Sequence, residues 1–172
     1  MILRLSRKLC TKLHVGALQT MPLDDNPFAD WSAHLFVADR AQYIIVSNTK
    51  SLYSTVLFGK GIRNDSQFIE RALSSLREFM ADEGQAFVYD RCIAPASGTI
   101  TFASALNRSI TGSMNELIRY ATVLLVVDEL SPPEVGFRLN DFILSAIASR
   151  KSAKYGRPRE AFKDMINGST VP

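Results

Sequence analysis

The segment from Asp30 to Phe58, DWSAHLFVADRAQYIIVSNTKSLYSTVLF, constrains the fold most, because β-branched and aromatic residues dominate it. Asp39-Arg40 and Asn48-Thr49-Lys50 interrupt it with residues that are typical of tight turns. Strands joined by such short turns pair antiparallel. The segment therefore predicts a three-stranded meander, with strands at residues 31–37, 43–47 and 52–58.

Trp31 and His34 belong to the first of these strands and are expected on opposite faces of it. Successive side chains alternate across a strand, so Trp31 shares a face with Ala33 and Leu35, whereas His34 shares the other with Ser32. Trp31 is then most simply a core anchor. His34 is expected to be a hydrogen-bonded strand residue rather than a catalytic base, and the two residues are not expected to form one site.

The rest of the chain carries signals for further helices and short strands. Capping residues and apolar residues at helical spacing predict helices at 6–13, 64–84, 113–127, 139–147 and 158–166, with Pro132-Pro133 ending the third segment. Ser6 is the expected cap of the first helix, and either Asn64 or Asp65 that of the second. Shorter apolar runs predict strands at 1–5, 87–93 and 99–102. Ser113-Met-Asn-Glu116 has the spacing of a capping box, which would make Ser113 the N-cap of a buried helix. The expected fold class is α+β: a single domain over residues 1–172, with a mostly antiparallel β-sheet packed with about five helices.

Composition argues against several classes of protein. The chain has 172 residues, of which 47% are hydrophobic and 22% charged, as is ordinary for a soluble domain. Its longest apolar run, residues 121–127, is too short to cross a bilayer, and charged residues interrupt the apolar runs after Met1, which disfavours a signal peptide. Cys10 and Cys92 are too few for a disulfide framework. A cytoplasmic protein with free thiols and no membrane partner is expected.

The sequence lacks the usual motifs of cofactor and metal chemistry. Gly59-Lys60-Gly61 is too short for a phosphate-binding loop, and no pair of the two histidines and two cysteines has the spacing of metal ligands. No Gly-x-Ser-x-Gly motif marks a nucleophilic serine. We therefore expect no cofactor and no metal. The net charge of +3 permits a nucleic-acid partner but does not require one.

Four stretches in this order resemble a known family: ILRLSRKL, DWSAHLFVADRAQYIIVSNTKSLYSTVL, NRSITGSMNEL and the tail LNDFILSAIASRKSAKYGRPREAF. The family is one of bacterial proteins described as a domain of unknown function, and the resemblance spans nearly the whole chain. Its most specific part is Arg108-Ser109 with Gly112-Ser113-Met114-Asn115. Typical members read DWHANLF, so the histidine at position 32 there stands at position 34 here. The resemblance implies a bacterial, cytoplasmic, single-domain protein and no particular activity.

One candidate site is the polar group around the predicted helix start at Ser113. A helix N-terminus with free amides suits an anion, and Arg108 would add a bidentate contact to a phosphate or carboxylate. In the alternative interpretation, Ser113 only caps the helix and Arg108 pairs with a nearby acid. The candidate residues are Asn107, Arg108, Ser109, Thr111, Ser113 and Asn115.

A second candidate site is the basic run near the C-terminus. Together with Arg4, Arg7, Lys8 and Lys12 it would make one positive face, which is what contact with a phosphate backbone requires. In the alternative interpretation, these residues are the solvated face of a helix pair. The candidate residues for nucleic-acid contact are Arg150, Lys151, Lys154, Arg157 and Arg159.

Three functions remain open from the sequence. The first is a non-enzymatic binding or regulatory module that acts through a protein partner or a homo-oligomer, and a flat apolar surface would favour it. The second is a nucleic-acid-binding accessory protein, which clustering of the basic residues would favour. The third is a small enzyme that acts on a phosphorylated or acidic metabolite, which a deep pocket converging on Arg108 and Asn115 would favour.

Overall fold

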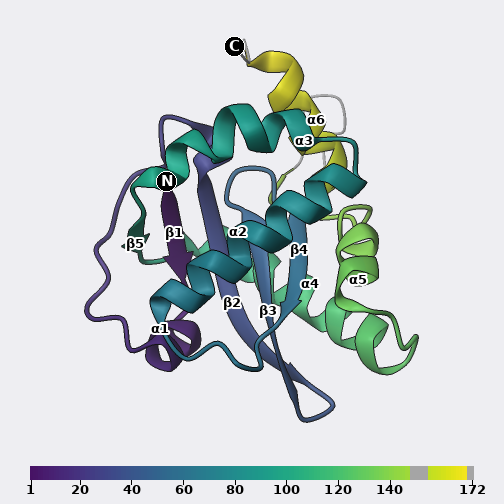
Figure 1. Cartoon of the computed structure of the whole chain (residues 1–172). Coiled ribbons are helices and arrows are strands. Elements are labelled where there is room, and N and C mark those ends of the chain that lie inside the picture. Colours follow the sequence, from purple (N-terminus) through teal and green to yellow (C-terminus); the bar gives the residue numbers. More distant parts are fainter. Residues whose placement is uncertain (148–154, 170–172) are drawn as a thin grey trace.

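A five-stranded sheet with helices on both faces forms the centre of the computed structural model, which describes residues 1–147 and 155–169 (Figure 1). The strands are β1 (Ile2–Leu5), β2 (Asp30–Ala38), β3 (Ala41–Asn48), β4 (Ser54–Phe58) and β5 (Thr101–Ala103). The helices are α1 (Arg7–Leu13), α2 (Asp65–Asp82), α3 (Ala86–Val88), α4 (Arg108–Val126), α5 (Pro132–Leu139) and α6 (Pro158–Gly168). Shorter helical turns are η1 (Pro27–Ala29), η2 (Tyr89–Ile93) and η3 (Pro95–Gly98).

The sheet is mixed, which corrects the expectation of a mostly antiparallel one. Its strand order is β4-β3-β2-β1-β5. The predicted meander is confirmed, because β2, β3 and β4 pair antiparallel in that order. However, β1 pairs parallel with both β2 and β5. The crossover through α1 returns the chain to the end of the sheet from which β1 starts, so β2 must run in the same direction as β1.

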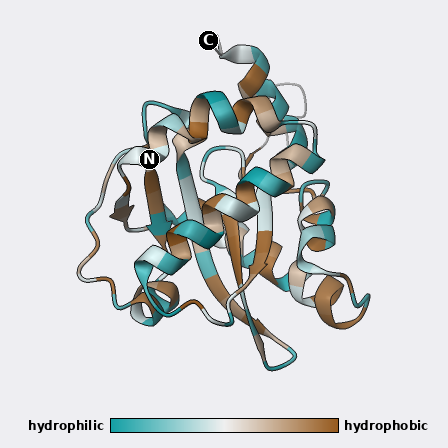
Figure 2. Cartoon of the chain, viewed as in Figure 1, coloured by the Kyte–Doolittle hydropathy of each residue, from teal (hydrophilic) through white to brown (hydrophobic). Residues whose placement is uncertain are grey.

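Two hydrophobic cores lie on the two faces of the sheet. Trp31 is fully buried on one face, where α1, α2 and α6 pack, and its indole N–H donates to the Phe28 carbonyl at 2.7 Å. Phe36 lies on the other face, which α4 and α5 cover. Figure 2 shows apolar residues along the strands between these helical layers. The prediction that Trp31 is buried and points away from the side of His34 is confirmed.

The N-cap of the helix predicted to follow Ser113 lies six residues earlier, so the assignment of Ser113 as N-cap is wrong. Asn107 is the N-cap of α4, and its side-chain oxygen accepts from the amide of Ile110 at 2.9 Å. Ser113 lies inside the helix on the buried side. Asparagine caps a helix as well as serine does, and Gly112 is tolerated in a helix interior at a modest cost, so capping-box spacing alone did not identify the start.

Two other segments were also assigned wrongly. Residues 87–93 form helical turns rather than a strand, because a short apolar run has no period that separates the two structures. The helix predicted at 139–147 lies earlier, at Pro132–Leu139. Pro132 starts that helix instead of ending the previous one, since a proline in the first turn gives up no hydrogen bond. The predicted starts of α1 after Ser6 and α6 at Pro158 are confirmed. Of the two caps expected for α2, Asn64 is the N-cap and Asp65 is the first helical residue.

The edge of the sheet formed by β4 is covered in part by the side chain of Asn140. Asn140 follows α5, which packs beside the edge strand β4. Its Oδ1 accepts from the Ser54 amide at 2.7 Å, and its Nδ2 donates to the Ser54 carbonyl at 3.1 Å. Asn140 therefore occupies both outward-facing backbone groups of one residue in β4.

Candidate functional site

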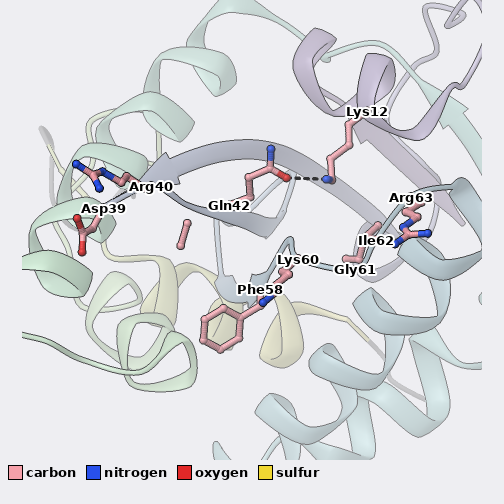
Figure 3. A pocket seen from close by; sticks show the side chains of 10 residues that line it. Lys12, Asp39, Arg40, Gln42, Phe58, Lys60, Gly61, Ile62 and Arg63 are labelled. Atoms are coloured by element: carbon pink, nitrogen blue, oxygen red, sulfur yellow. Dashed lines mark hydrogen bonds between the residues drawn. The ribbon is translucent and has the colours of Figure 1, made fainter.

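An open groove of about 630 Å³ lies beside the β2–β3 hairpin. Its walls come from four parts of the chain: the end of α1, the hairpin turn, the end of β4 and the loop from Gly59 to Arg63. We call it the hairpin groove. Figure 3 shows Lys12, Gln42 and Lys60 along its middle, Arg63 at one end, and Asp39 with Arg40 at the other.

The hairpin turn that forms one end of the groove has an unusual backbone. Ala38 pairs with Ala41, so only Asp39 and Arg40 connect β2 to β3. Their φ angles are +42° and +64°, which is the left-handed conformation required at both positions of the tightest hairpin turn. Glycine or asparagine usually occupies such positions, and other residues lose about 1 kcal/mol there. The tight turn that places Arg40 at the end of the groove therefore forms at a cost in stability.

The loop on the opposite wall is held by specific contacts. The Gly59 amide donates to the Gln42 carbonyl at 2.7 Å, and a Cβ at Gly59 would lie only 3.1 Å from Gln42. Gly61 adopts a φ of +84°, and Ile62 anchors the loop in the core. Arg71 donates from Nη1 to the Lys60 carbonyl at 3.2 Å. These contacts fix the loop that carries Lys60 and Arg63.

The groove concentrates positive charge. Four cationic side chains line it, against the single carboxylate of Asp39: Lys12, Arg40, Lys60 and Arg63. None of the four forms an ion pair with any residue that the structure describes, although Lys12 donates to the Gln42 side chain at 2.6 Å. The local excess of three positive charges equals the net charge of the whole chain. A concave surface of one sign raises the local concentration of the opposite ion.

An exposed aromatic ring borders the same groove. Phe58 is 51% exposed, and its ring centroid lies 5.3 Å from that of Tyr43. Tyr43 in turn stacks on Phe36 at 5.7 Å, so three rings follow one another across β4, β3 and β2. These rings lie on the face of the sheet that α4 and α5 cover, whereas Lys12 and Ile62 line the groove from the other face. The Phe58 ring therefore borders the groove and points away from its cations.

The six residues of the first predicted site do not converge. Asn107, Arg108, Ser109 and Asn115 are exposed, Thr111 is half-buried, and Ser113 points into the core. Asn107 uses its side-chain oxygen as the cap of α4. Arg108 forms no ion pair with the described residues. Anion binding by this group stays a prediction.

The second predicted site is only partly described. Arg150, Lys151 and Lys154 lie outside the described residues. Arg157 forms an exposed pair with Glu160 at 3.8 Å. Arg159 forms ion pairs with Glu83 and Asp141, and donates to the Phe137 carbonyl, so it is engaged within the protein.

The N-terminal cations do not share one face either. Arg4 is buried in an ion pair with Asp30, whereas Lys12 lines the hairpin groove. Sequence reasoning missed Arg40, Lys60 and Arg63 as groove residues. Gly59-Lys60-Gly61 and the Asp39-Arg40 turn were visible signals, but nothing in the sequence shows that they meet.

Metal and membrane features are absent from the described part of the chain. Residues 1–147 and 155–169 contain no group of three histidine, cysteine or acidic side chains that could hold a metal ion. Across the same residues, no helix combines the length and apolar character needed to span a bilayer. Cys10 and Cys92 are both free thiols.

Comparison with known proteins identifies a family. Searches of curated proteins and of solved structures gave no match. Residues 2–161 match the family described as Domain of unknown function (DUF6933), and this match covers most of the chain. The protein therefore belongs to the DUF6933 family.

Proposed function

We propose that the protein is a binding module for a phosphorylated small molecule, which it holds in the hairpin groove. The observation that carries this proposal is the set of four cations without ion-pair partners among the described residues around one hollow. Arginine binds phosphate oxygens with two parallel N–H groups, and lysine binds them as a point charge. The groove offers both kinds of contact.

The volume of the hairpin groove limits the size of the ligand. A volume of about 630 Å³ lies within the range of about 300–1,000 Å³ that is usual for small-molecule sites. The ligand class that best fits the cations and this volume is a phosphorylated small molecule, for which a nucleoside monophosphate is a suitable probe.

Binding fits the groove better than turnover does. Its polar side chains are mostly lysine, arginine and an amide, which hold an anion, and its lining includes no histidine or cysteine. A groove lined by cations also suits the phosphate backbone of single-stranded nucleic acid. The experiment must therefore distinguish binding of a phosphorylated small molecule from binding of single-stranded nucleic acid.

The test measures binding of a nucleoside monophosphate, its unphosphorylated nucleoside and a short single-stranded oligonucleotide by calorimetry. We expect the monophosphate to bind and the nucleoside to bind at least about tenfold more weakly, because a hydrogen bond to a charged group is worth about 1.5–3 kcal/mol. Lys60→Gln with Arg63→Gln should remove binding without a change in melting temperature. Lys50→Gln, an exposed lysine outside the groove, is the matched control and should change nothing.

Three results would decide against the proposal. Binding of the oligonucleotide alone, lost in the Lys60 and Arg63 variant, would favour the nucleic-acid function. Equal binding of nucleoside and monophosphate, or no binding of any probe, would show that the groove does not recognise phosphate.

A further inference from the structure

The sheet has a step at the carboxyl ends of its parallel strands. β1 ends at Leu5 and β5 at Ala103, whereas β2, parallel to β1, continues to Ala38. After β1 the chain enters α1 on one face of the sheet, and after β5 it enters α4 on the opposite face. Where neighbouring parallel strands lead to opposite faces, a crevice opens beyond their carboxyl ends, and ligands of open sheets commonly bind there.

A pocket of about 440 Å³ occupies this crevice. Leu5, Ser6 and Cys10 reach it from the β1–α1 connection, and Ser104 and Thr111 from the β5–α4 connection. His34 lines it from the part of β2 that extends past both strands. We call it the His34 pocket. Most of its remaining lining is apolar, from Ala17, Leu18 and Ala105.

His34 is the buried polar side chain of this pocket that lacks a hydrogen-bond partner among the described residues. It is only 8% exposed, and its imidazole makes no hydrogen bond to any residue that the structure describes. Two of the pocket's hydroxyls donate to backbone carbonyls, Thr111 to Asn107 at 3.1 Å and Ser104 to Gln19 at 3.3 Å. The Ser6 hydroxyl accepts from the Leu9 amide at 3.3 Å. The imidazole is not among the fully buried polar groups without a partner, so its nitrogens still reach solvent at the pocket. A ligand with a hydroxyl or N–H group there would replace water as the hydrogen-bond partner of His34.

The charge state of His34 limits what that ligand can be. Desolvation lowers the pKa of His34 to about 4, so the imidazole is neutral at neutral pH. A neutral imidazole in an apolar pocket does not compensate the burial of a charged group. The nearest cation in the lining, Arg7, is exposed, so a charged ligand that reached it would stay in contact with water.

We propose that the His34 pocket is a second binding site, which takes a neutral, mainly apolar small molecule with one hydroxyl or N–H group that hydrogen-bonds to the His34 imidazole. This site is separate from the hairpin groove and independent of the function proposed for it. The ligand of the His34 pocket is neutral, whereas the ligand proposed for the hairpin groove is an anion. In the His34 pocket the selective interaction is a single hydrogen bond in apolar surroundings.

The experiment follows both imidazoles of the full chain by NMR at neutral pH during titration with naphthol. The only other histidine, His14, is exposed and lies outside the pocket lining, so it is an internal control. We expect naphthol to shift the His34 resonances and leave those of His14 unchanged. Naphthalene, which lacks the hydroxyl, should bind about tenfold more weakly. Naphthoate, which is charged, should leave the His34 resonances unmoved.

A pair of variants tests the same interaction by affinity. His34→Leu should weaken naphthol binding about tenfold and leave naphthalene binding unchanged. His14→Gln should change neither. If His34→Leu does not fold, the three probes on the wild-type chain still decide. Equal affinity for naphthol and naphthalene, a His34 shift caused mainly by naphthoate, or no His34 shift with naphthol would each overturn the proposal.

Discussion

The guanidinium of Arg4 meets the carboxylate of Asp30 inside the protein. Nε donates to Oδ1 at 2.8 Å and Nη2 to Oδ2 at 2.7 Å, and both side chains are buried. Arg4 also donates to the carbonyls of Met21 and Pro22. The pair thus ties β1 to the start of β2 and to the loop that leads into it.

Arg4→Met should therefore destabilise the protein by about 3–5 kcal/mol, because it leaves the charge of Asp30 buried and unpaired. Asp30→Asn should also be destabilising, since it removes the negative partner. The double variant Arg4→Met with Asp30→Asn should lose less than the sum of the two single variants. Urea denaturation measures all three, and strictly additive losses would contradict a coupled buried pair.

Stability should fall at mildly acidic pH because of His34. Its pKa is about 4 in the folded chain against an ordinary 6.5, so between these values the unfolded chain binds a proton that the folded chain does not. The contribution is complete above pH 6.5 and is lost as the pH falls toward 4. It amounts to about 3 kcal/mol, since one pKa unit corresponds to about 1.4 kcal/mol.

The free energy of unfolding, measured across this pH range, tests that expectation. The decline should be reduced in His34→Leu and retained in His14→Gln. Parallel profiles for the wild type and His34→Leu would show that His34 does not cause the decline.

Stability and ligand binding should change in opposite directions at Arg40. Arg40→Gly relieves the left-handed backbone of the turn and should stabilise the protein by up to about 1 kcal/mol, partly offset by the greater freedom of glycine in the unfolded chain. It also removes one cation from the hairpin groove, so the affinity for a nucleoside monophosphate should fall. Thermal unfolding and calorimetry on the same sample measure the two effects, and unchanged affinity would remove Arg40 from the site.

The true start of α4 can be tested with two alanine variants. Asn107→Ala should cost about 1 kcal/mol, because it removes the side-chain acceptor for the Ile110 amide. Ser113→Ala should stay within about 0.5 kcal/mol, because alanine is the better helix former in a helix interior. A larger loss at Ser113 than at Asn107 in chemical denaturation would contradict the helix start at Arg108.

Local signals in the sequence were sufficient where the structure depends on neighbouring residues. The two-residue alternation around Trp31 correctly gave the two faces of β2, and Ser6 and Asn64 correctly marked two helix starts. The signals failed where several residues could serve equally well. Asn107 and Ser113 are both good caps, and only packing against the sheet decides between them.

Long-range pairing was beyond local patterns. β5 lies about a hundred positions from its partner β1, and nothing in either segment specifies that they run parallel. The hairpin groove also depends on residues that lie far apart in the sequence. Lys12, Arg40 and Lys60 belong to three separate elements, and only the folded sheet brings them together. Candidate sites drawn from sequence favoured clusters such as Asn107 to Asn115, whose members point in different directions around one helix.

The contact of Asn140 with β4 also bears on self-association. An edge strand with free amides and carbonyls is a template on which another chain can add a strand and begin aggregation. At Ser54 both groups are already bonded to one side chain, so a second copy cannot extend the sheet at that residue without displacing Asn140. The Asn140 side chain thus blocks the addition of another strand at this point of β4, the strand of the meander that lies farthest from β1.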